Sequence, residues 1–199
     1  MAELVRFHFD PACPWAYQGS KWIREVEKVR DIEVDWRLFS LTLVNQEAED
    51  PLAGAHDEGL RALRTLVLVR NEAGNDGVER VYAAIGARSH EQGRRLTADA
   101  LAAALRDEGF DTGLMDKAIQ DESTIAAVRT EHDAGVADVG AFGVPTVVLS
   151  SGKGMFGPVV AVAPTGEAAG ELWDHVRALI EWEGLFELKR DRDREPGGV

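Results

Sequence analysis

The chain has 199 residues, 45% of them apolar, which is enough to bury one hydrophobic core. Its formal net charge of −13 argues against binding to nucleic acid or to a membrane surface, because phosphates would repel it. A single cysteine excludes an internal disulfide and a cysteine-based metal site, and the five histidines show no metal-ligand spacing, so we expect no metal. No apolar run approaches the ~20 residues of a membrane span, and a reducing, cytoplasmic location fits the lone cysteine best.

The first 39 residues predict two strands joined by a helix. Apolar and polar side chains alternate over residues 3–9 and again over 32–39, as in half-buried strands. Between them, from Pro14 to about Arg30, apolar residues recur near helical spacing. A helical crossover between two strands of one sheet makes the strands parallel, so we expect a parallel pair.

The middle of the chain predicts helices only. Residues 41–50 read as a loop, and residues 51–140 are rich in Ala, Leu, Arg and Glu without a convincing strand. Amphipathic segments predict helices over 60–70, 78–89, 98–106, 114–119 and 123–136, with Thr97 and Thr112 opening the third and fourth. Because each segment has an apolar face to bury, we interpret residues 46–140 as a helical insertion subdomain and not as a linker.

Strand-like sequence returns at residues 143–149, followed by a tight turn at 151–154, a short strand at 155–157 and a last helix over 166–183. This order predicts an α/β, thioredoxin-like fold with an all-helical subdomain inserted after the second strand. Residues 1–45 and 141–186 would form the discontinuous thioredoxin-like domain, and residues 187–199 a flexible charged tail. A cis Val144–Pro145 bond would explain a proline at the start of a hairpin strand.

The only cysteine stands where the first helix should begin. Pro14 has a fixed φ and no N–H, which suits the first helical position and makes Cys13 the N-cap. A thiol there faces free backbone N–H groups and the positive end of the helix dipole. Both favour the reactive thiolate, so we expect the pKa of Cys13 to lie below that of a free cysteine.

Several motifs resemble one known family. The pattern Phe-x-x-Asp-Pro-x-Cys-Pro-Trp, from Phe7 to Trp15, resembles the active-site turn of DsbA-family thioredoxin-like proteins, and Gly143 to Thr146 resembles their cis-proline loop. More narrowly, Phe156 to Val159, Pro164 to Glu167 and Leu172 to Asp174 are similar to the actinobacterial mycothiol-dependent nitroreductase group. The resemblance covers nearly the whole chain and implies a thiol oxidoreductase.

One departure from that group constrains the chemistry. Its members usually carry Cys-Pro-Trp-Cys, whereas this chain reads Cys13-Pro14-Trp15-Ala16. Ala16 cannot attack a mixed disulfide on Cys13, so an external thiol must resolve it. We therefore expect a single nucleophilic cysteine that works with a low-molecular-weight thiol, mycothiol or glutathione, and reduces a small electrophile such as a nitro compound.

Other residues are candidates for binding the substrate or the thiol. Trp15 would flank the thiolate and stack on a flat substrate, and a cis Pro145 opposite Cys13 would leave the Val144 backbone free to pair with a bound thiol. Asn45 matches a position where the resembling group has a polar residue near the thiol. We expect Cys13 to be the nucleophile. His90 would be a proton donor or would bind an acidic group. The residues expected to bind substrate or thiol are Pro14, Trp15, Asn45, His90, Val144 and Pro145.

Two other functions stay open. The same family includes kappa-class glutathione transferases and chromene-carboxylate isomerases, which need one position to bind or activate a thiol. Alternatively, the chain is a non-catalytic binding protein that lost redox function with the second cysteine. We expect small molecules as partners, and either a monomer or a homodimer.

Overall fold

The computed structural model describes residues 2–45 and 53–197. Its sheet consists of β1 (Glu3–Phe9), β2 (Ile32–Leu38), β3 (Thr146–Val148) and β4 (Gly154–Phe156), in the order β2-β1-β3-β4. β1 pairs with β2 in parallel, whereas β3 is antiparallel to both β1 and β4. The expected parallel pair and hairpin are therefore confirmed.

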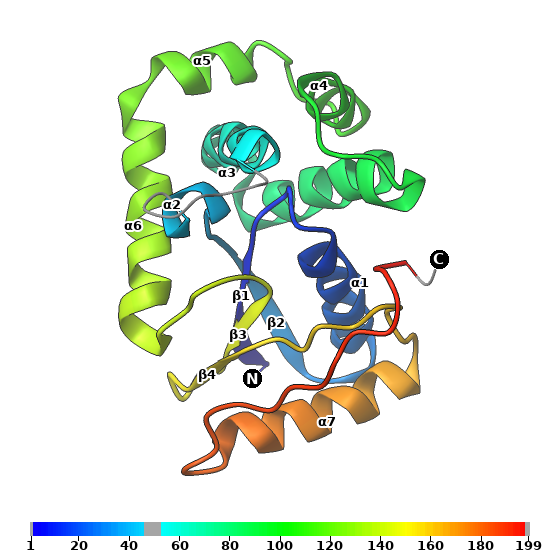
Figure 1. Ribbon diagram of the computed structural model, residues 1–199. Helices are drawn as coiled ribbons and strands as arrows, with labels where there is room; N and C mark the ends of the chain where they lie inside the picture. Colours follow the sequence, from blue (N-terminus) through cyan, green and yellow to red (C-terminus); the bar gives the residue numbers. More distant parts are fainter. Residues whose placement is uncertain (1, 46–52, 198–199) are drawn as a thin grey trace.

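Two helices support the sheet from one side (Figure 1). Helix α1 (Pro14–Val29) connects β1 to β2, and α7 (Glu167–Glu181) follows the hairpin and packs against α1. The indole of Trp22 on α1 is fully buried, and its Nε1 donates to the Ala169 carbonyl of α7 at 3.1 Å. This packing fixes α1, and with it the turn at its first residue.

The other described helices lie between β2 and β3 in the chain. They occupy the upper part of Figure 1, with the last of them in the chain running down its left-hand side beside the sheet. They are α2 (Leu41–Val44), α3 (Ala53–Ser89), the 3-10 helix η1 (His90–Gln92), α4 (Ala98–Asp107), α5 (Leu114–Gln120) and α6 (Glu122–Val139). The two helices expected over 60–70 and 78–89 are joined within α3, which bends at Gly74, where φ is 67° and ψ is −159°. One hydrophobic core runs from the sheet into these helices.

The capping predictions are confirmed in part. The Thr97 side chain accepts the Ala100 N–H at the start of α4, as expected. Thr112, however, does not open α5: Gly113 precedes that helix, and Asp111 accepts the Gly113 N–H. The loop expected over 41–50 was wrong at its beginning, because the Ser40 side chain caps the short α2 there. Residues 46–50 of that expected loop lie outside the described residues.

Side chains of the helices cover the outer edge of β2. Asn75 of α3 accepts the N–H of Trp36 at 2.9 Å and donates to the carbonyl of Val34 at 2.8 Å. Glu131 of α6 accepts the N–H of Leu38 at 2.8 Å. The edge strand thus has partners for backbone groups that would otherwise be open.

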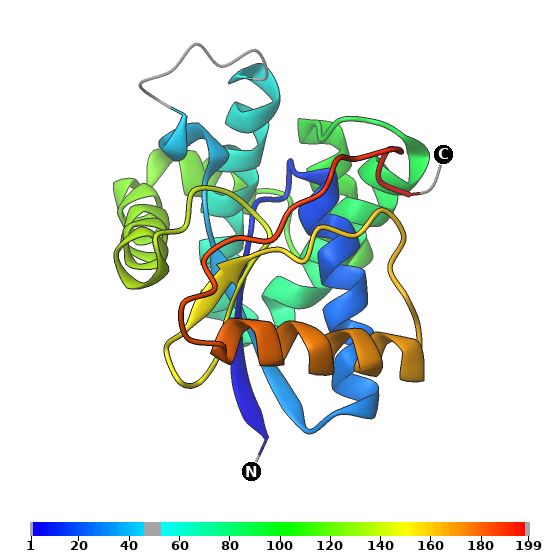
Figure 2. The same ribbon diagram turned by 60° about the horizontal axis from the view of Figure 1, so that its bottom comes forward.

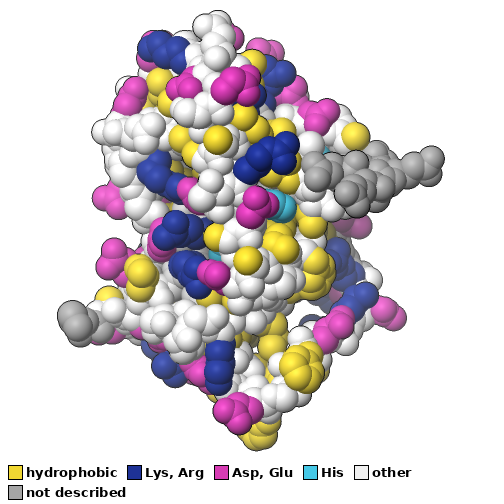
Figure 3. Space-filling view, turned by 90° about the vertical axis from the view of Figure 1, so that its left-hand side faces the viewer, with side chains coloured by type: hydrophobic (Ala, Val, Ile, Leu, Met, Phe, Trp, Pro, Cys, Tyr) yellow, Lys and Arg dark blue, Asp and Glu magenta, His cyan; other side chains and the backbone are white. Residues whose placement is uncertain are grey.

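The end of the chain lies against the molecule. After α7 the backbone turns back and runs beside residues 157–163 towards the first turn of α1 (Figure 2), and the N–H of Gly197 donates to the Ala161 carbonyl at 2.7 Å. On the α6 side, acidic and basic side chains are intermingled (Figure 3). Within the described ranges, no helix has the length and hydropathy that crossing a membrane requires.

Candidate active site at the start of helix α1

Cys13 is the N-cap of α1, as expected. Its backbone is extended, with φ −88° and ψ 111°, and Pro14 is the first helical residue. The Ala16 N–H donates to Cys13 Sγ at 3.4 Å, and the Cys13 N–H donates to the Asp10 carbonyl at 3.0 Å. The side chain is half-buried and carries the one thiol of the chain.

The hairpin brings Val144 and Pro145 to the same place. The Cys13 thiol donates to the Val144 carbonyl, with Sγ 3.7 Å from the oxygen, and the Val144–Pro145 peptide bond is cis. Pro145 packs on α1 where Gly19 leaves room, since a Cβ at Gly19 would stand 3.2 Å from Pro145 Cγ. The structure therefore unites Cys13, Val144 and Pro145, which lie far apart in the sequence.

The prediction of a lowered thiol pKa is wrong. Burial raises the pKa of Cys13 from an ordinary 9.0 to about 11, and the negative charge of Asp10 adds to the rise. The N–H groups of Ala16 and Trp15 and the charge of Arg192 lower the pKa, as the helix terminus should, but burial has the larger effect. Cys13 is consequently a neutral thiol at neutral pH in this conformation, which suits its hydrogen bond to a carbonyl.

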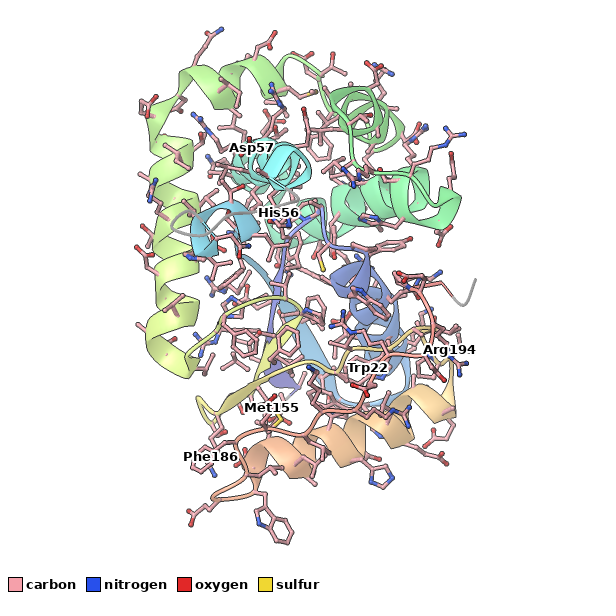
Figure 4. All side chains as sticks on the ribbon, viewed as in Figure 1. Trp22, His56, Asp57, Met155, Phe186 and Arg194 are labelled. Carbon is pink, nitrogen blue, oxygen red and sulfur yellow. The ribbon has the colours of Figure 1, made fainter. Side chains whose placement is uncertain are left out.

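Asp10 is the site residue that the sequence analysis missed. Its carboxylate is fully buried between β1 and α1 and accepts the N–H groups of Leu41 and Ala12, both at 2.8 Å. Burial raises the pKa of Asp10 to about 6, although these two bonds and the charge of His56 lower it. His56 is itself buried and lies near the upper end of β1 (Figure 4). The Asp-Pro pair before the cysteine was the available signal, because an aspartate there readily caps a turn.

Trp15 lies beside the tail. Its indole is half-buried, and the guanidinium of Arg192 lies 4.6 Å from the ring centroid. Between Trp15 and residues 192–195 is a hollow of about 490 Å³. The tail, expected to be a flexible charged end, thus lies against Trp15 and forms one wall of this hollow. Figure 4 labels Arg194 of the tail.

Two expected site residues make other contacts. The Nδ2 of Asn45 donates to the Leu41 carbonyl at 2.8 Å, at the end of α2. His90 Nε2 lies 2.8 Å from the Pro11 carbonyl, and its ring packs on Tyr17 at a centroid distance of 5.5 Å. Burial lowers the pKa of His90, so its ring is neutral and holds the turn that precedes Cys13. Their roles in binding a substrate stay predictions.

No cluster of His, Cys, Asp or Glu side chains in the part of the chain that the structure describes is arranged to hold a metal ion. The groups that the structure brings together here are one thiol, a buried carboxylate and the backbone groups around them.

A family model described as "Rv2466c-like: Mycothiol-dependent nitroreductase Rv2466c" matches residues 12–190, a range that includes Cys13 and the cis-proline loop. The chain belongs to the Rv2466c-like family. A Mycobacterium tuberculosis (strain ATCC 25618 / H37Rv) relative, the uncharacterized protein Rv2286c, is 38% identical over 191 residues, which cover 94% of this chain and 82% of the relative.

Solved structures agree with the fold of this Rv2466c-like protein. The probable DsbA oxidoreductase SCO1869 from Streptomyces coelicolor superposes with a TM-score of 0.60 at 18% identity, over 98% of this chain and 97% of that one. The cytosolic disulfide reductase DsbM from Pseudomonas aeruginosa, solved with GSH, superposes with a TM-score of 0.59 at 14% identity, over 88% of this chain and 100% of that one. The thioredoxin-like α/β fold expected from the sequence is confirmed.

Proposed function

We propose that this Rv2466c-like protein is a monothiol oxidoreductase in which Cys13 is the nucleophile and an external low-molecular-weight thiol completes the cycle. The observation that supports this most directly is the environment of Cys13. Its sulfur faces the Ala16 N–H and the Val144 carbonyl beside a cis proline, while the position of a resolving cysteine holds the buried methyl group of Ala16.

The cycle begins with loss of the Cys13 proton. Because the resting group is a thiol, deprotonation is part of the reaction, and the N–H groups of Trp15 and Ala16 stabilise the thiolate once it forms. The thiolate attacks one sulfur of a small disulfide, forming the Cys13 mixed disulfide and releasing the other sulfur as a thiolate. A second small thiolate then attacks the mixed disulfide, which frees Cys13 and yields a new small disulfide.

The same site also suits a two-electron reduction of a nitro compound. In that reaction Cys13 and one small thiol supply the two electrons and two protons. They form the mixed disulfide while the nitro group becomes a nitroso group and loses one oxygen as water. A second small thiol then releases Cys13 as in the first cycle, so the net co-reactant is two small thiols per nitro group.

The identity of the small thiol is part of this proposal. The name of the matching family supports mycothiol, and the GSH in the DsbM structure supports a small thiol in this kind of site. The groups proposed to bind it are Pro14, Trp15, Asn45, His90 and the Val144–Pro145 backbone. The cytoplasmic location expected for a protein with one reduced cysteine belongs to the same proposal.

Intact mass spectrometry tests the nucleophile. After treatment with oxidised mycothiol, the wild-type chain should gain one mycothiol through Cys13, and reduced mycothiol should remove it. Cys13→Ser should gain nothing, and Cys13→Ala serves as a second control. An unmodified wild-type chain across the pH range, with thiol-dependent turnover absent, would rule out the monothiol cycle.

Turnover of the serine variant separates the alternatives. A transferase or isomerase that binds its thiol without a disulfide would keep turnover in Cys13→Ser, since a hydroxyl can still donate to a bound thiolate. A binding protein would show neither turnover nor alkylation of Cys13 in its native state.

A further inference from the structure

The tail places a cation next to the candidate nucleophile. Arg192 lies over the Trp15 ring, at 4.6 Å from its centroid, and Trp15 is two residues from Cys13. The positive charge of Arg192 also acts on Cys13, where it favours the thiolate. Arg192 therefore lies close enough to the candidate nucleophile for its charge to act on the thiol.

Arg192 has no carboxylate partner. Among residues 2–45 and 53–197, no Asp or Glu oxygen lies within ion-pair distance of its guanidinium, although the chain has 35 acidic residues. The neighbouring Arg194 differs, because it pairs with Asp193 at 2.8 Å. A guanidinium held over an aromatic ring keeps N–H donors in its plane, and these suit a carboxylate.

The space beside Arg192 is an open hollow. Its volume is about 490 Å³, and it is lined by Trp15 and by residues 192–195. Of the four charges on its wall, Arg194 and Asp193 neutralise each other. The two that remain are Arg192 and Glu195, of opposite sign.

We propose that Arg192 is a specificity-determining residue of the Cys13 site, which recognises a carboxylate or an equivalent anionic group on a small reactant and holds it over Trp15. The nearby Glu195 opposes the same ligand by repulsion. The inference rests on the proposed function in taking Cys13 as the reacting group. Its first test uses compounds that cannot react with Cys13.

The binding test compares two ligands that differ by one charge. N-acetyl-S-methylcysteine carries a carboxylate, its methylamide is neutral, and neither can exchange with a thiol. Titration of the full chain, followed by the NMR signal of the Trp15 indole N–H, should show about fivefold tighter binding of the acid, as expected for one solvent-exposed charge pair.

The variants assign that preference to a residue. In Arg192→Ala the preference for the acid should be lost, and the neutral amide should bind at least as tightly because Glu195 remains. In Glu195→Gln the preference for the acid should increase. Arg190→Ala, a tail arginine that does not line the hollow, should keep the wild-type preference. Equal binding of both ligands to the wild type, or an unchanged preference in Arg192→Ala, would overturn the inference.

Alkylation of Cys13 gives a second readout. The rate ratio of anionic iodoacetate to neutral iodoacetamide should fall about fivefold in Arg192→Ala. If this variant instead reacts faster with both reagents and keeps their ratio, the tail is a steric cover and the specificity role is refuted. A Cys13 that reacts with neither reagent contradicts the proposed function, while the binding titration still decides the role of Arg192.

Discussion

Gly59 of α3 lies directly against the carboxylate of Asp10. A Cβ atom at Gly59 would stand 2.3 Å from Asp10 Oδ1 and 2.9 Å from the Cβ of Ala12. The helical part of the chain thus touches the turn that carries Cys13, and the turn's buried carboxylate has no room to move towards α3.

Gly59→Ala should therefore destabilise the protein, although alanine is the better helix former by about 1 kcal/mol. Overpacking against Asp10 should cost about 2 kcal/mol net in the free energy of unfolding, measured by urea denaturation. Gly54→Ala is the matched control, since it lies in the same helix and a Cβ there meets no atom within 4 Å. Equal stability of the two variants would contradict the contact.

Asp10→Asn should lower the pKa of Cys13, because the negative charge of Asp10 is one of the causes of its rise to about 11. The measurement is the pH dependence of the thiolate absorbance in the ultraviolet, with Cys13→Ser as the blank. Asp57→Asn provides a control, since Asp57 is an exposed residue of α3. A thiol pKa that stays the same or rises in Asp10→Asn would show that the two groups do not interact.

Asp10 should also make the protein more stable in mild acid. The pKa of Asp10 is about 6 in the folded chain against an ordinary 3.8, so the folded state binds the proton first as the pH falls. This contribution is fully present below pH 3.8 and is lost as the pH rises through about 6. It amounts to about 3 kcal/mol, measured as the difference between wild type and Asp10→Asn in urea unfolding at pH 4 and pH 7.

His8 should act in the opposite direction. It is buried in β1, and neither ring nitrogen has a hydrogen-bond partner among the described residues. Burial, with the charges of Arg6 and Arg37, lowers the pKa of His8 from 6.5 to about 4; Asp138 raises it and His132 lowers it slightly. The contribution of the neutral His8 to the free energy of unfolding is fully present above pH 6.5. It is lost as the pH falls towards 4, because the unfolded chain takes up the proton that the folded chain excludes.

The size of this loss is about 3 kcal/mol, close to the gain from Asp10, so these two contributions should nearly cancel between pH 4 and 6. His8→Leu removes the loss and should leave a protein that gains stability as the pH falls. If His8→Leu and wild type follow the same pH profile, His8 is not excluded from protonation in the fold.

Ala16→Cys should restore an internal resolving thiol. In the wild type, the mixed disulfide on Cys13 persists until a thiol is added, since the Ala16 methyl group cannot attack it. In Ala16→Cys the adduct should disappear without added thiol, leaving a chain two hydrogens lighter by intact mass. Ala16→Ser, which has no thiol, should behave as the wild type; a persistent adduct in Ala16→Cys would show that position 16 cannot reach Cys13.

The parts of the fold that local pattern determines could be predicted from the sequence. The alternation in β1 and β2 and the Cys13-Pro14 start of α1 are local signals, and the structure has them at nearly the expected residues. The two helices expected over 60–70 and 78–89 are likewise present, on either side of Gly74, whose backbone is non-helical.

At the site, the features that depend on charge and burial could not be predicted from local sequence. The helix terminus correctly indicated N–H groups around Cys13, but the thiol pKa depends on how deeply the sulfur is buried, which is a property of the whole fold. Asp10 and Arg192 escaped notice for the same reason. One is buried by α3, and the other reaches Trp15 only because the tail turns back.

The bonds from Asn75 and Glu131 to β2 close one margin of the sheet. The N–H groups of Trp36 and Leu38 already have acceptors within the chain, so another strand cannot align there without displacing α3 and α6. Pairing of a second polypeptide along β2 is therefore blocked as long as α3 and α6 stay in place.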